Sequence, residues 1–201
     1  MVQVRTLLRA AAPLLLLAST TRATPTRSSP VAVAPDGAVF VVNPDQGTVA
    51  RLTYDGDGHG TLTHEASVGA YPRTVAVAGA WVFTADQQGD GVSRRDQADL
   101  GGLQQVTLGP GCNPFGIAPT PAGDRLLVTC QGRSELVVLD TALAVQARIA
   151  LDWPQARAVA AGDDGRVFVT HFLTAEPGHD AHVSVVDLAQ ARVATVWSIP
   201  P

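Results

Sequence analysis

The chain has 201 residues, a net charge of −4 and a hydrophobic fraction of 46%. This length and composition fit one globular domain of ordinary size or two small ones. A pI near 5.6 gives no basic surplus, so nucleic acid is not an expected partner. All 14 basic residues are arginine, which excludes lysine Schiff-base chemistry within this chain.

The first 23 residues have the pattern of a secretory signal peptide. Two arginines and no acid come first, an apolar stretch covers residues 10–18, and small residues follow. The apolar stretch is too short to span a bilayer, which takes about 20 residues. Cleavage after Ala18 and after Ala23 both fit, and a disordered apolar leader is the alternative. The pattern predicts a secreted or periplasmic protein whose mature chain, residues 24–201, has no membrane span.

The remainder of the chain repeats every 42 residues. Prolines at positions 30, 72 and 114 mark the step. The same step, without a gap, joins four β-branched residues that are each followed by alanine: Val33, Val75, Ile117 and Val159. Every repeat holds four short apolar runs separated by turns rich in Gly, Asp and Pro, and no run keeps a helical period for three turns.

Four short antiparallel strands per 40–45 residues are typical of a β-propeller blade. The sequence therefore predicts an all-β propeller with four-stranded blades at approximately residues 28–69, 70–111, 112–155 and 156–199. A stacked β-solenoid is the alternative, but its repeats are usually much shorter. Three of the third strands end in aspartate, and each aspartate is expected to start the next turn by bonding the backbone two residues on: Asp96, Asp140 and Asp187.

The second strands resemble the YVTN motif. They read FVVN (40–43), VFTA (82–85), LVTC (127–130) and FVTH (168–171), and the turns PDG (35–37) and GDDG (162–165) match the same repeat. Only Asn43 keeps the final Asn. The resemblance covers residues 28–199. It implies a secreted or surface-located propeller, usually of seven blades, and it names a c-type cytochrome or a di-haem peroxidase-like domain as a candidate partner.

Loops on one face of a propeller usually carry its binding site. Six residues are the candidates for this ligand-binding face: Asn43, Arg73, Asp86, Gln131, Arg157 and His171. Arg73 and Arg157 share one register position, so two guanidinium groups near the axis could hold a carboxylate or a phosphate. The alternative is ordinary surface ion pairing with Asp86 or other loop acids. The expected occupant is a protein partner or a small ligand.

No metal or cofactor is expected, although two segments contain suitable ligands. The loop 171–182 holds His171, His179 and His182, whose spacing matches no standard zinc site. The segment 55–60 begins like a calcium loop, but Ala66 stands where a bidentate Glu belongs. The sequence contains no Cys-x-x-Cys-His motif, so this chain attaches no c-type haem.

The two cysteines, Cys112 and Cys130, are predicted to form a disulfide. Cys112 precedes the first strand of the third repeat and Cys130 ends the second strand. Because these strands run antiparallel, the two residues approach each other. Secretion would supply the oxidising compartment that the bond needs. Two free thiols are the alternative.

The 42-residue register next reaches residue 198, so the tail 197–201 is interpreted as the end of the fourth blade's outer strand and the entry to a fifth blade that is absent. The sequence thus predicts an open arc of four blades, cut from a longer parent or completed by another chain. A closed four-bladed ring is the alternative, because known rings have about 4–8 blades.

Two functions follow from these patterns. The first is a binding or docking scaffold that serves a protein or a small ligand. The second is a propeller enzyme, such as a lactone hydrolase with a divalent ion at the axis. The first strands offer Val, Ile, Ala and Gly where such an ion needs inward carboxylates, and no catalytic motif occurs in the sequence. The sequence therefore favours binding over catalysis and does not name the ligand.

Overall fold

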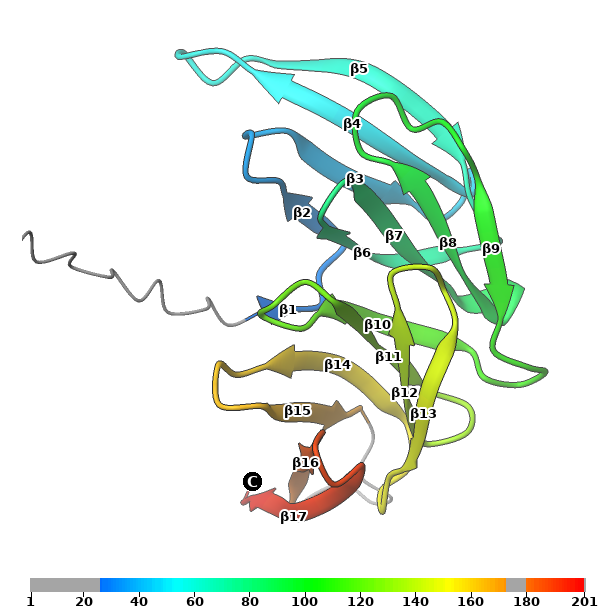
Figure 1. The fold of residues 1–201 in the computed structure, drawn as a ribbon, viewed down its shortest axis with the longest axis vertical. Coiled ribbons are helices and arrows are strands. Elements are labelled where there is room, and N and C mark those ends of the chain that lie inside the picture. Colours follow the sequence, from blue (N-terminus) through cyan, green and yellow to red (C-terminus); the bar gives the residue numbers. More distant parts are fainter. Residues whose placement is uncertain (1–25, 173–179, 201) are drawn as a thin grey trace, which may run out of the picture.

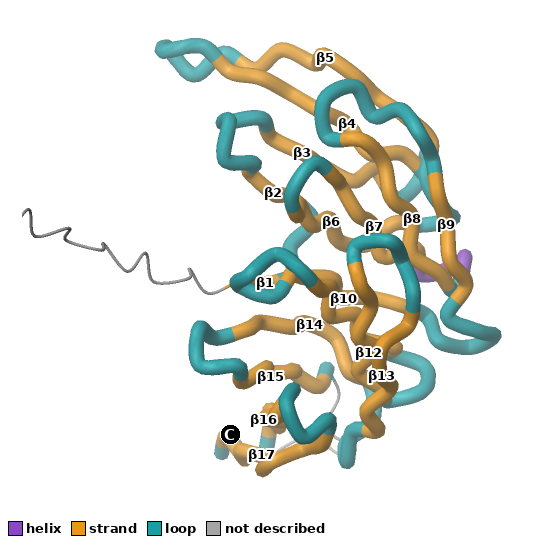
Figure 2. Tube along the Cα trace, viewed as in Figure 1, coloured by secondary structure: helices purple, strands orange, loops and turns teal. Residues whose placement is uncertain are grey.

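The computed structural model describes residues 26–172 and 180–200, which form four antiparallel sheets, called blades 1 to 4 below (Figures 1 and 2). The signal-peptide prediction for residues 1–23 lies outside the described residues. The one helical element described is a 3-10 turn, η1 (Gln87–Gly89). No helix in this part of the chain is long and apolar enough to cross a membrane.

Each blade contains four strands that pair in chain order. Blade 1 consists of β2 (Val31–Val33), β3 (Val39–Asn43), β4 (Thr48–Tyr54) and β5 (Gly60–Ser67). Blade 2 consists of β6 (Pro72–Ala78), β7 (Trp81–Asp86), β8 (Gly91–Asp96) and β9 (Gln104–Thr107). Blade 3 consists of β10 (Pro114–Pro119), β11 (Arg125–Cys130), β12 (Glu135–Asp140) and β13 (Val145–Ala150). Blade 4 consists of β14 (Ala156–Ala161), β15 (Arg166–His171), β16 (Ala181–Asp187) and β17 (Arg192–Ile199).

The predicted architecture, an all-β propeller-type fold with four blades, is confirmed. The blades fan into a C-shaped arc, with the inner strands β2, β6, β10 and β14 on its concave side (Figure 1). Blades 1 and 4 stand at the two ends and do not meet, so the ring is open, as predicted.

Apolar cores fill the spaces between neighbouring blades. Val75, Ile117 and Val159 each lie in the core shared with the preceding blade and are 1%, 0% and 1% exposed. Val33 has the same register position in blade 1, where no blade precedes it, and it is 64% exposed. The 42-residue register is therefore the spacing of the residues that fasten each blade to the one before it.

Short turns join the third and fourth strands, as the aspartates predicted. The Oδ1 atom of each aspartate accepts a hydrogen bond from the backbone N–H two residues on, at 2.8 Å for Asp96, 2.9 Å for Asp140 and 2.9 Å for Asp187. Asp55 makes the same bond in blade 1, at 3.0 Å. All four hairpins therefore begin with the same aspartate-capped turn.

Threonine hydroxyls of blades 2 and 3 bond the inner strand of the following blade. The Thr74 hydroxyl donates to the carbonyl of Phe115 at 2.7 Å and accepts from the N–H of Ile117 at 2.9 Å. The Thr129 hydroxyl donates to the carbonyl of Arg157 at 2.6 Å. These bonds satisfy buried backbone groups that the bulges at the start of β10 and β14 leave outside the sheet ladder.

Sequence patterns did not predict the strand β1 (Thr26–Arg27), which adds a fifth strand to blade 4. It pairs antiparallel with the inner edge of β14, and the Thr26 hydroxyl bonds the carbonyl of Pro119 in blade 3. Ser28 then donates its N–H to the carbonyl of Val159 at 2.7 Å. A free strand edge presents unpaired backbone groups, and β1 covers such an edge on the concave side.

Candidate binding face

One side of the arc carries the connections that enter each inner strand, and we call this side the loop face. Three of these connections end in a residue with a left-handed backbone, at the same 42-residue step: Tyr71 (φ 58°), Asn113 (φ 47°) and Gln155 (φ 58°). The inner strand begins at the next residue in each case. This shared entry geometry places the second residue of β6, β10 and β14 at equivalent positions on the loop face.

Those equivalent residues are Arg73, Phe115 and Arg157, and they stack on one another. The guanidinium carbon of Arg73 lies 5.3 Å from the centre of the Phe115 ring, and that of Arg157 lies 4.3 Å from it. Tyr71 lies 4.5 Å from the Arg73 guanidinium and Phe172 lies 3.7 Å from that of Arg157. We call these five residues the Arg–Phe ladder. Each cation–π contact contributes about 0.5–1 kcal/mol where it is exposed.

Among residues 26–172 and 180–200, the two ladder arginines find few partners for their hydrogen-bond donors. Arg73 donates from Nε to Oε1 of Gln87 at 2.6 Å, and Gln87 donates in turn to Gln131 at 3.0 Å. Within residues 26–172 and 180–200, neither Arg73 nor Arg157 forms an ion pair. Two half-buried cations without a carboxylate partner in the described part of the chain raise the local positive potential and can accept an anion.

Asp86 does not pair with the ladder arginines. Its side chain is 2% exposed and accepts hydrogen bonds from the hydroxyls of Thr84 at 2.7 Å and Ser93 at 2.5 Å. Burial raises the pKa of Asp86 to about 6, although the bonds from Ser93 and Thr84 favour the charged form. A cavity of about 300 Å³ lies beside it. A side chain on Gly69 would overlap the Asp86 carboxylate, so this glycine permits the close approach.

The last residue of the second strand has one structural role in blades 2, 3 and 4. Asp86, Cys130 and His171 are register equivalents, because they pair with Pro72, Pro114 and Ala156 at the start of the inner strands. Each contacts the connection that enters its own blade, and we call this the latch position. In blade 2 the contact runs through Ser93, which accepts the N–H of Gly69 at 2.9 Å.

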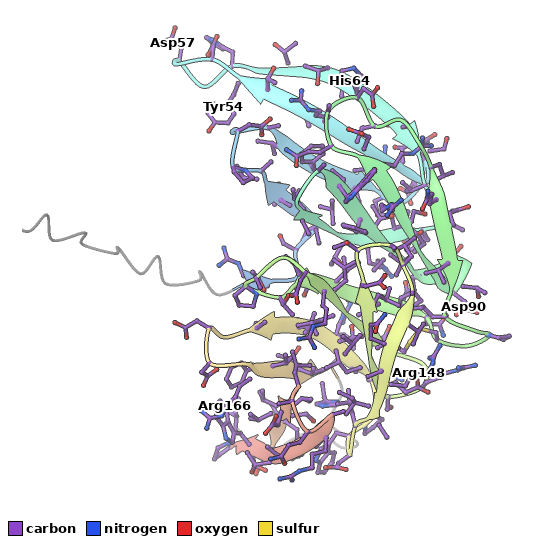
Figure 3. All side chains as sticks on the ribbon, in the orientation of Figure 1. Tyr54, Asp57, His64, Asp90, Arg148 and Arg166 are labelled. Atoms are coloured by element: carbon purple, nitrogen blue, oxygen red, sulfur yellow. A yellow bond between two sulfur atoms is a disulfide. The ribbon has the colours of Figure 1, made fainter. Side chains whose placement is uncertain are left out.

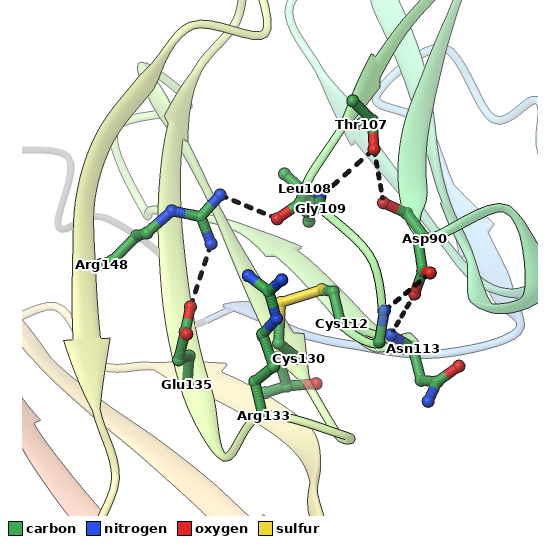
Figure 4. The surroundings of a disulfide bond; sticks show 12 residues. Asp90, Thr107, Leu108, Gly109, Cys112, Asn113, Cys130, Arg133, Glu135 and Arg148 are labelled. Atoms are coloured by element: carbon green, nitrogen blue, oxygen red, sulfur yellow. Dashed lines mark hydrogen bonds and ion pairs between the residues drawn. A yellow bond between two sulfur atoms is a disulfide. The ribbon is translucent and has the colours of Figure 1, made fainter.

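The latch of blade 3 is the predicted disulfide, which is confirmed. Cys112 and Cys130 are bonded, and both are fully buried. The Asp90 carboxylate holds the connection on both sides of Cys112, because it accepts the N–H groups of Gly111 and Asn113 at 2.8 Å each (Figure 4). The loop around Cys112 is therefore hydrogen-bonded to Asp90 of blade 2 and covalently joined to Cys130 of blade 3.

The latch of blade 4 is a histidine with both ring nitrogens engaged. Nδ1 of His171 lies 2.9 Å from the carbonyl oxygen of Pro154, and Nε2 lies 2.9 Å from the hydroxyl of Ser184. A carbonyl only accepts, so Nδ1 carries the proton and Ser184 donates to Nε2. Burial lowers the pKa of His171, which favours this neutral form.

The weak metal candidates do not converge among the described residues. His182 stacks on Trp153 with ring centres 3.6 Å apart, and His179 lies outside the described residues. Asp55, Asp57 and His59 gather within 4.8 Å at the exposed β4–β5 turn. The Asp55 carboxylate is already used there by the N–H groups of Asp57 and His59. Of the remaining face candidates, Asn43 is exposed at the end of β3 and Gln131 is half-buried beside Gln87.

The opposite side of the arc, the turn face, holds a cavity of about 580 Å³ between blades 3 and 4. Four of its charged lining residues form two ion pairs, and Asp163 and Asp187 line it as well. Arg166 lies 2.8 Å from Asp164 and Arg125 lies 3.6 Å from Asp124. These pairs neutralise one another, unlike the ladder arginines on the loop face.

Sequence reasoning placed both arginines and Phe115 on this face, but it predicted neither their stacking nor the part played by Tyr71 and Phe172. Phe115 shares the 42-residue step with Arg73 and Arg157, and this step was the available signal. Tyr71 lies two residues before Arg73 and repeats the place of Asn113 and Gln155. Phe172 follows β15 directly and carried no signal that sequence alone would show.

Comparison with known proteins supports the fold and does not identify a family. No protein-family model matches the chain, and no curated protein matches it in sequence. A similar solved structure is Kuenenia stuttgartiensis hydrazine synthase, with a TM-score of 0.73 and 22% identity over 85% of this chain and 48% of that one.

Two further structures are similar. Virginiamycin B lyase from Staphylococcus aureus has a TM-score of 0.64 and 13% identity, over 87% of this chain and 55% of that one. A protein from Lactobacillus plantarum has a TM-score of 0.67 and 16% identity, over 86% and 56%. These neighbours are β-propeller-like proteins. At this identity the likeness concerns the fold alone, and the chain spans about half the length of each neighbour.

Proposed function

We propose that this chain is a secreted or periplasmic propeller-type scaffold that binds an anionic group of a protein partner or small ligand on its loop face. One observation carries the proposal. Arg73 and Arg157 stand on either side of Phe115 with no carboxylate partner among the described residues. A carboxylate or phosphate can accept several guanidinium N–H groups at once, and the stacked rings hold the guanidiniums in place.

The ladder is pre-organised for this task. Arg73 is fixed from one side by Gln87 and from two others by aromatic rings, and Arg157 is held between two phenylalanines. An immobilised side chain has already lost its rotamer entropy, which would otherwise reduce the binding free energy. A ligand therefore meets two ordered cations rather than two mobile ones.

Two features support a location outside the cytoplasm. The buried disulfide belongs to a class of bond that persists in oxidising compartments. Residues 1–23 have the charge and apolar pattern of a secretory signal. The YVTN resemblance adds a c-type cytochrome or peroxidase-like domain as the candidate partner, and such a partner would carry the haem because this sequence has no attachment motif.

The enzyme alternative has less support from the site. A lactone hydrolase with an axial divalent ion needs carboxylates on the inner strands, and the equivalent positions there carry Arg73, Phe115 and Arg157. Two neighbours have enzyme names, hydrazine synthase and virginiamycin B lyase, so the fold is compatible with catalysis. The buried carboxylate of Asp86 already accepts hydrogen bonds from two hydroxyls and forms no ion pair with Arg73 or Arg157.

Calorimetric titration tests the proposal with citrate as a small anion and an oligo-aspartate peptide as a model of an acidic protein surface. The wild-type chain should bind at least one of them at low salt, and the affinity should fall as salt rises. The variant Arg73→Gln/Arg157→Gln should lose affinity by about tenfold or more. Arg166→Gln/Arg192→Gln removes the same charge from the turn face and should retain binding.

The two probes distinguish the source of the anion. Citrate binding alone indicates a small ligand, and peptide binding indicates a protein partner. Equal loss in both double variants would mean that net charge, not the ladder, attracts the anion. Absence of binding to the wild-type chain would reject the proposal.

A further inference from the structure

The two ends of the arc expose apolar sheet faces. At the blade 1 end, four large hydrophobic residues are exposed: Val31 45%, Val33 64%, Tyr54 59% and Leu62 55%. They share one face, because Val33 pairs with Val39, Val39 with Leu52, and Leu52 with Leu62 across the sheet. Figure 3 shows Tyr54 near the turn end of this blade, away from blade 2.

Blade 4 has a matching bare face at the other end. Trp197 and Ile199 on its outermost strand are each 51% exposed. The Trp197 ring packs on Phe168 of β15, with ring centres 5.4 Å apart, so the patch extends across the sheet. Phe168 pairs with Ala160 of β14 on the same face. The equivalent pair in blade 3, Leu127 with Ala118, is fully buried against blade 4.

The two bare faces are of complementary kinds. In the three existing contacts, the following face of one blade packs on the preceding face of the next. The bare face of blade 4 is a following face, and the bare face of blade 1 is a preceding face. They therefore correspond to the two halves of a contact that the molecule already makes three times, although the open arc keeps them apart.

We propose that two copies of this chain close one ring of eight blades, in which blade 4 of each copy packs on blade 1 of the other. Each contact is heterologous, and two copies related by a twofold axis satisfy both ends at once. Eight blades lie within the known range of ring sizes, about 4–8. The neighbours are about twice as long as the part that this chain matches, and two arcs of this size together have a comparable length.

The proposed contact between blade 4 and blade 1 differs from the three existing contacts in one turn. The turns between third and fourth strands in blades 2, 3 and 4 each place a leucine on the preceding blade: Leu100, Leu143 and Leu188. The corresponding turn of blade 1 contains Asp55, Asp57 and His59 and is exposed. Tyr54 and Leu62, which flank this turn, supply the apolar contact in its place.

Size-exclusion chromatography with light scattering tests the proposal on the full chain, with the disulfide formed. The expected mass is twice that of the monomer. Leu62→Glu alters the face of blade 1 and Trp197→Glu alters that of blade 4, and each variant should be monomeric. Both residues are more than half exposed in the single arc, so neither change should alter the strand content reported by far-ultraviolet circular dichroism. Val145→Glu, at an exposed position in the internal blade 3, should remain dimeric.

Mixing the two variants gives the decisive result. In a mixed pair, the native blade 4 of the Leu62→Glu chain meets the native blade 1 of the Trp197→Glu chain, so one contact is intact and dimers return. Three outcomes would overturn the proposal: a monomeric wild-type chain, a series of larger wild-type polymers, or loss of the dimer in only one of the two variants. The last outcome would indicate a contact between like faces.

Discussion

Reduction of the Cys112–Cys130 disulfide should lower the free energy of unfolding by about 3 kcal/mol. The bond closes a loop of 18 positions, and the chain-entropy relation gives about 3 kcal/mol at 25 °C for a loop of that length. The folded structure should change little, because Asp90 holds the loop on both sides of Cys112 and the carbonyl of Cys112 accepts the N–H of Gly132. The loss therefore arises mainly in the unfolded chain.

Urea unfolding followed by tryptophan fluorescence, with and without reductant, measures this difference. For a chain of this size, about 3 kcal/mol corresponds to a fall in melting temperature of roughly 6–12 °C. Both sulfur atoms are fully buried, so the reductant must be added to the unfolded chain before refolding. The variant Cys112→Ala/Cys130→Ala provides the control, since reductant should not change its stability.

A difference below about 1 kcal/mol would refute this reasoning. It would mean that the reduced, unfolded chain already keeps residues 112 and 130 close together, so that the bond removes little entropy. A much larger difference, above about 5 kcal/mol, would instead show that reduction disrupts the core between blades 2 and 3, in which both cysteines lie.

Three further predictions concern the interior. The contribution of Asp86 to the free energy of unfolding should fall by on the order of 3 kcal/mol as pH rises from about 4 to about 6. The folded pKa of Asp86 is raised to about 6, so folding favours its protonated form. Asp86→Asn should lose this part of the pH dependence in urea titrations. Gly69→Ala should cost about 1–3 kcal/mol through overlap with Asp86, whereas Gly60→Ala, with open space around it, should be near neutral; equal effects would contradict the clash. Thr74→Val should cost about 1–3 kcal/mol by leaving a buried N–H of β10 unpaired, and a stability unchanged in thermal melts would rule this out.

The periodicity of the sequence was sufficient to predict the blades. The inner strands of blades 2, 3 and 4 each place one β-branched residue against the preceding blade, and the constant step from Val75 to Val159 follows from this packing. The aspartate-capped turns were predictable for a similar reason, because an aspartate side chain bonds a backbone group only two residues away. Local rules and a fixed repeat length leave little freedom in such elements.

Features that depend on distant contacts escaped prediction. The short strand β1 has no apolar pattern, and it forms because the inner edge of β14 offers unpaired backbone groups 130 or more positions along the chain, as the bond between Ser28 and Val159 shows. Part of the Arg–Phe ladder was predictable from the sequence, because Arg73 and Arg157 share a register position. The stacking on Phe115 and Phe172 could not be inferred, because it depends on how far apart the blades stand.

The latch position shows why the motif alignment misplaced one residue. Aligned by motif, Ala85 occupies the last place of the second strand in blade 2, yet the structure pairs Asp86 with the first residue of the inner strand, as it does Cys130 and His171. Asp86 accepts hydrogen bonds from two hydroxyls, Cys130 forms a disulfide, and His171 forms hydrogen bonds as a neutral ring. No shared residue type could therefore mark the position. What they share is a position: each ends a second strand beside the connection that enters its blade.

Any side chain that reaches the connection from this position can fasten it. The residue type can therefore vary while the structural role stays constant. The loop face then rests on three connections, fastened at Gly69, Cys112 and Pro154. The equivalent residues Arg73, Phe115 and Arg157 lie three or four residues beyond these points. The loop face, which we propose as the binding face, is thus fastened by contacts that sequence similarity would not reveal.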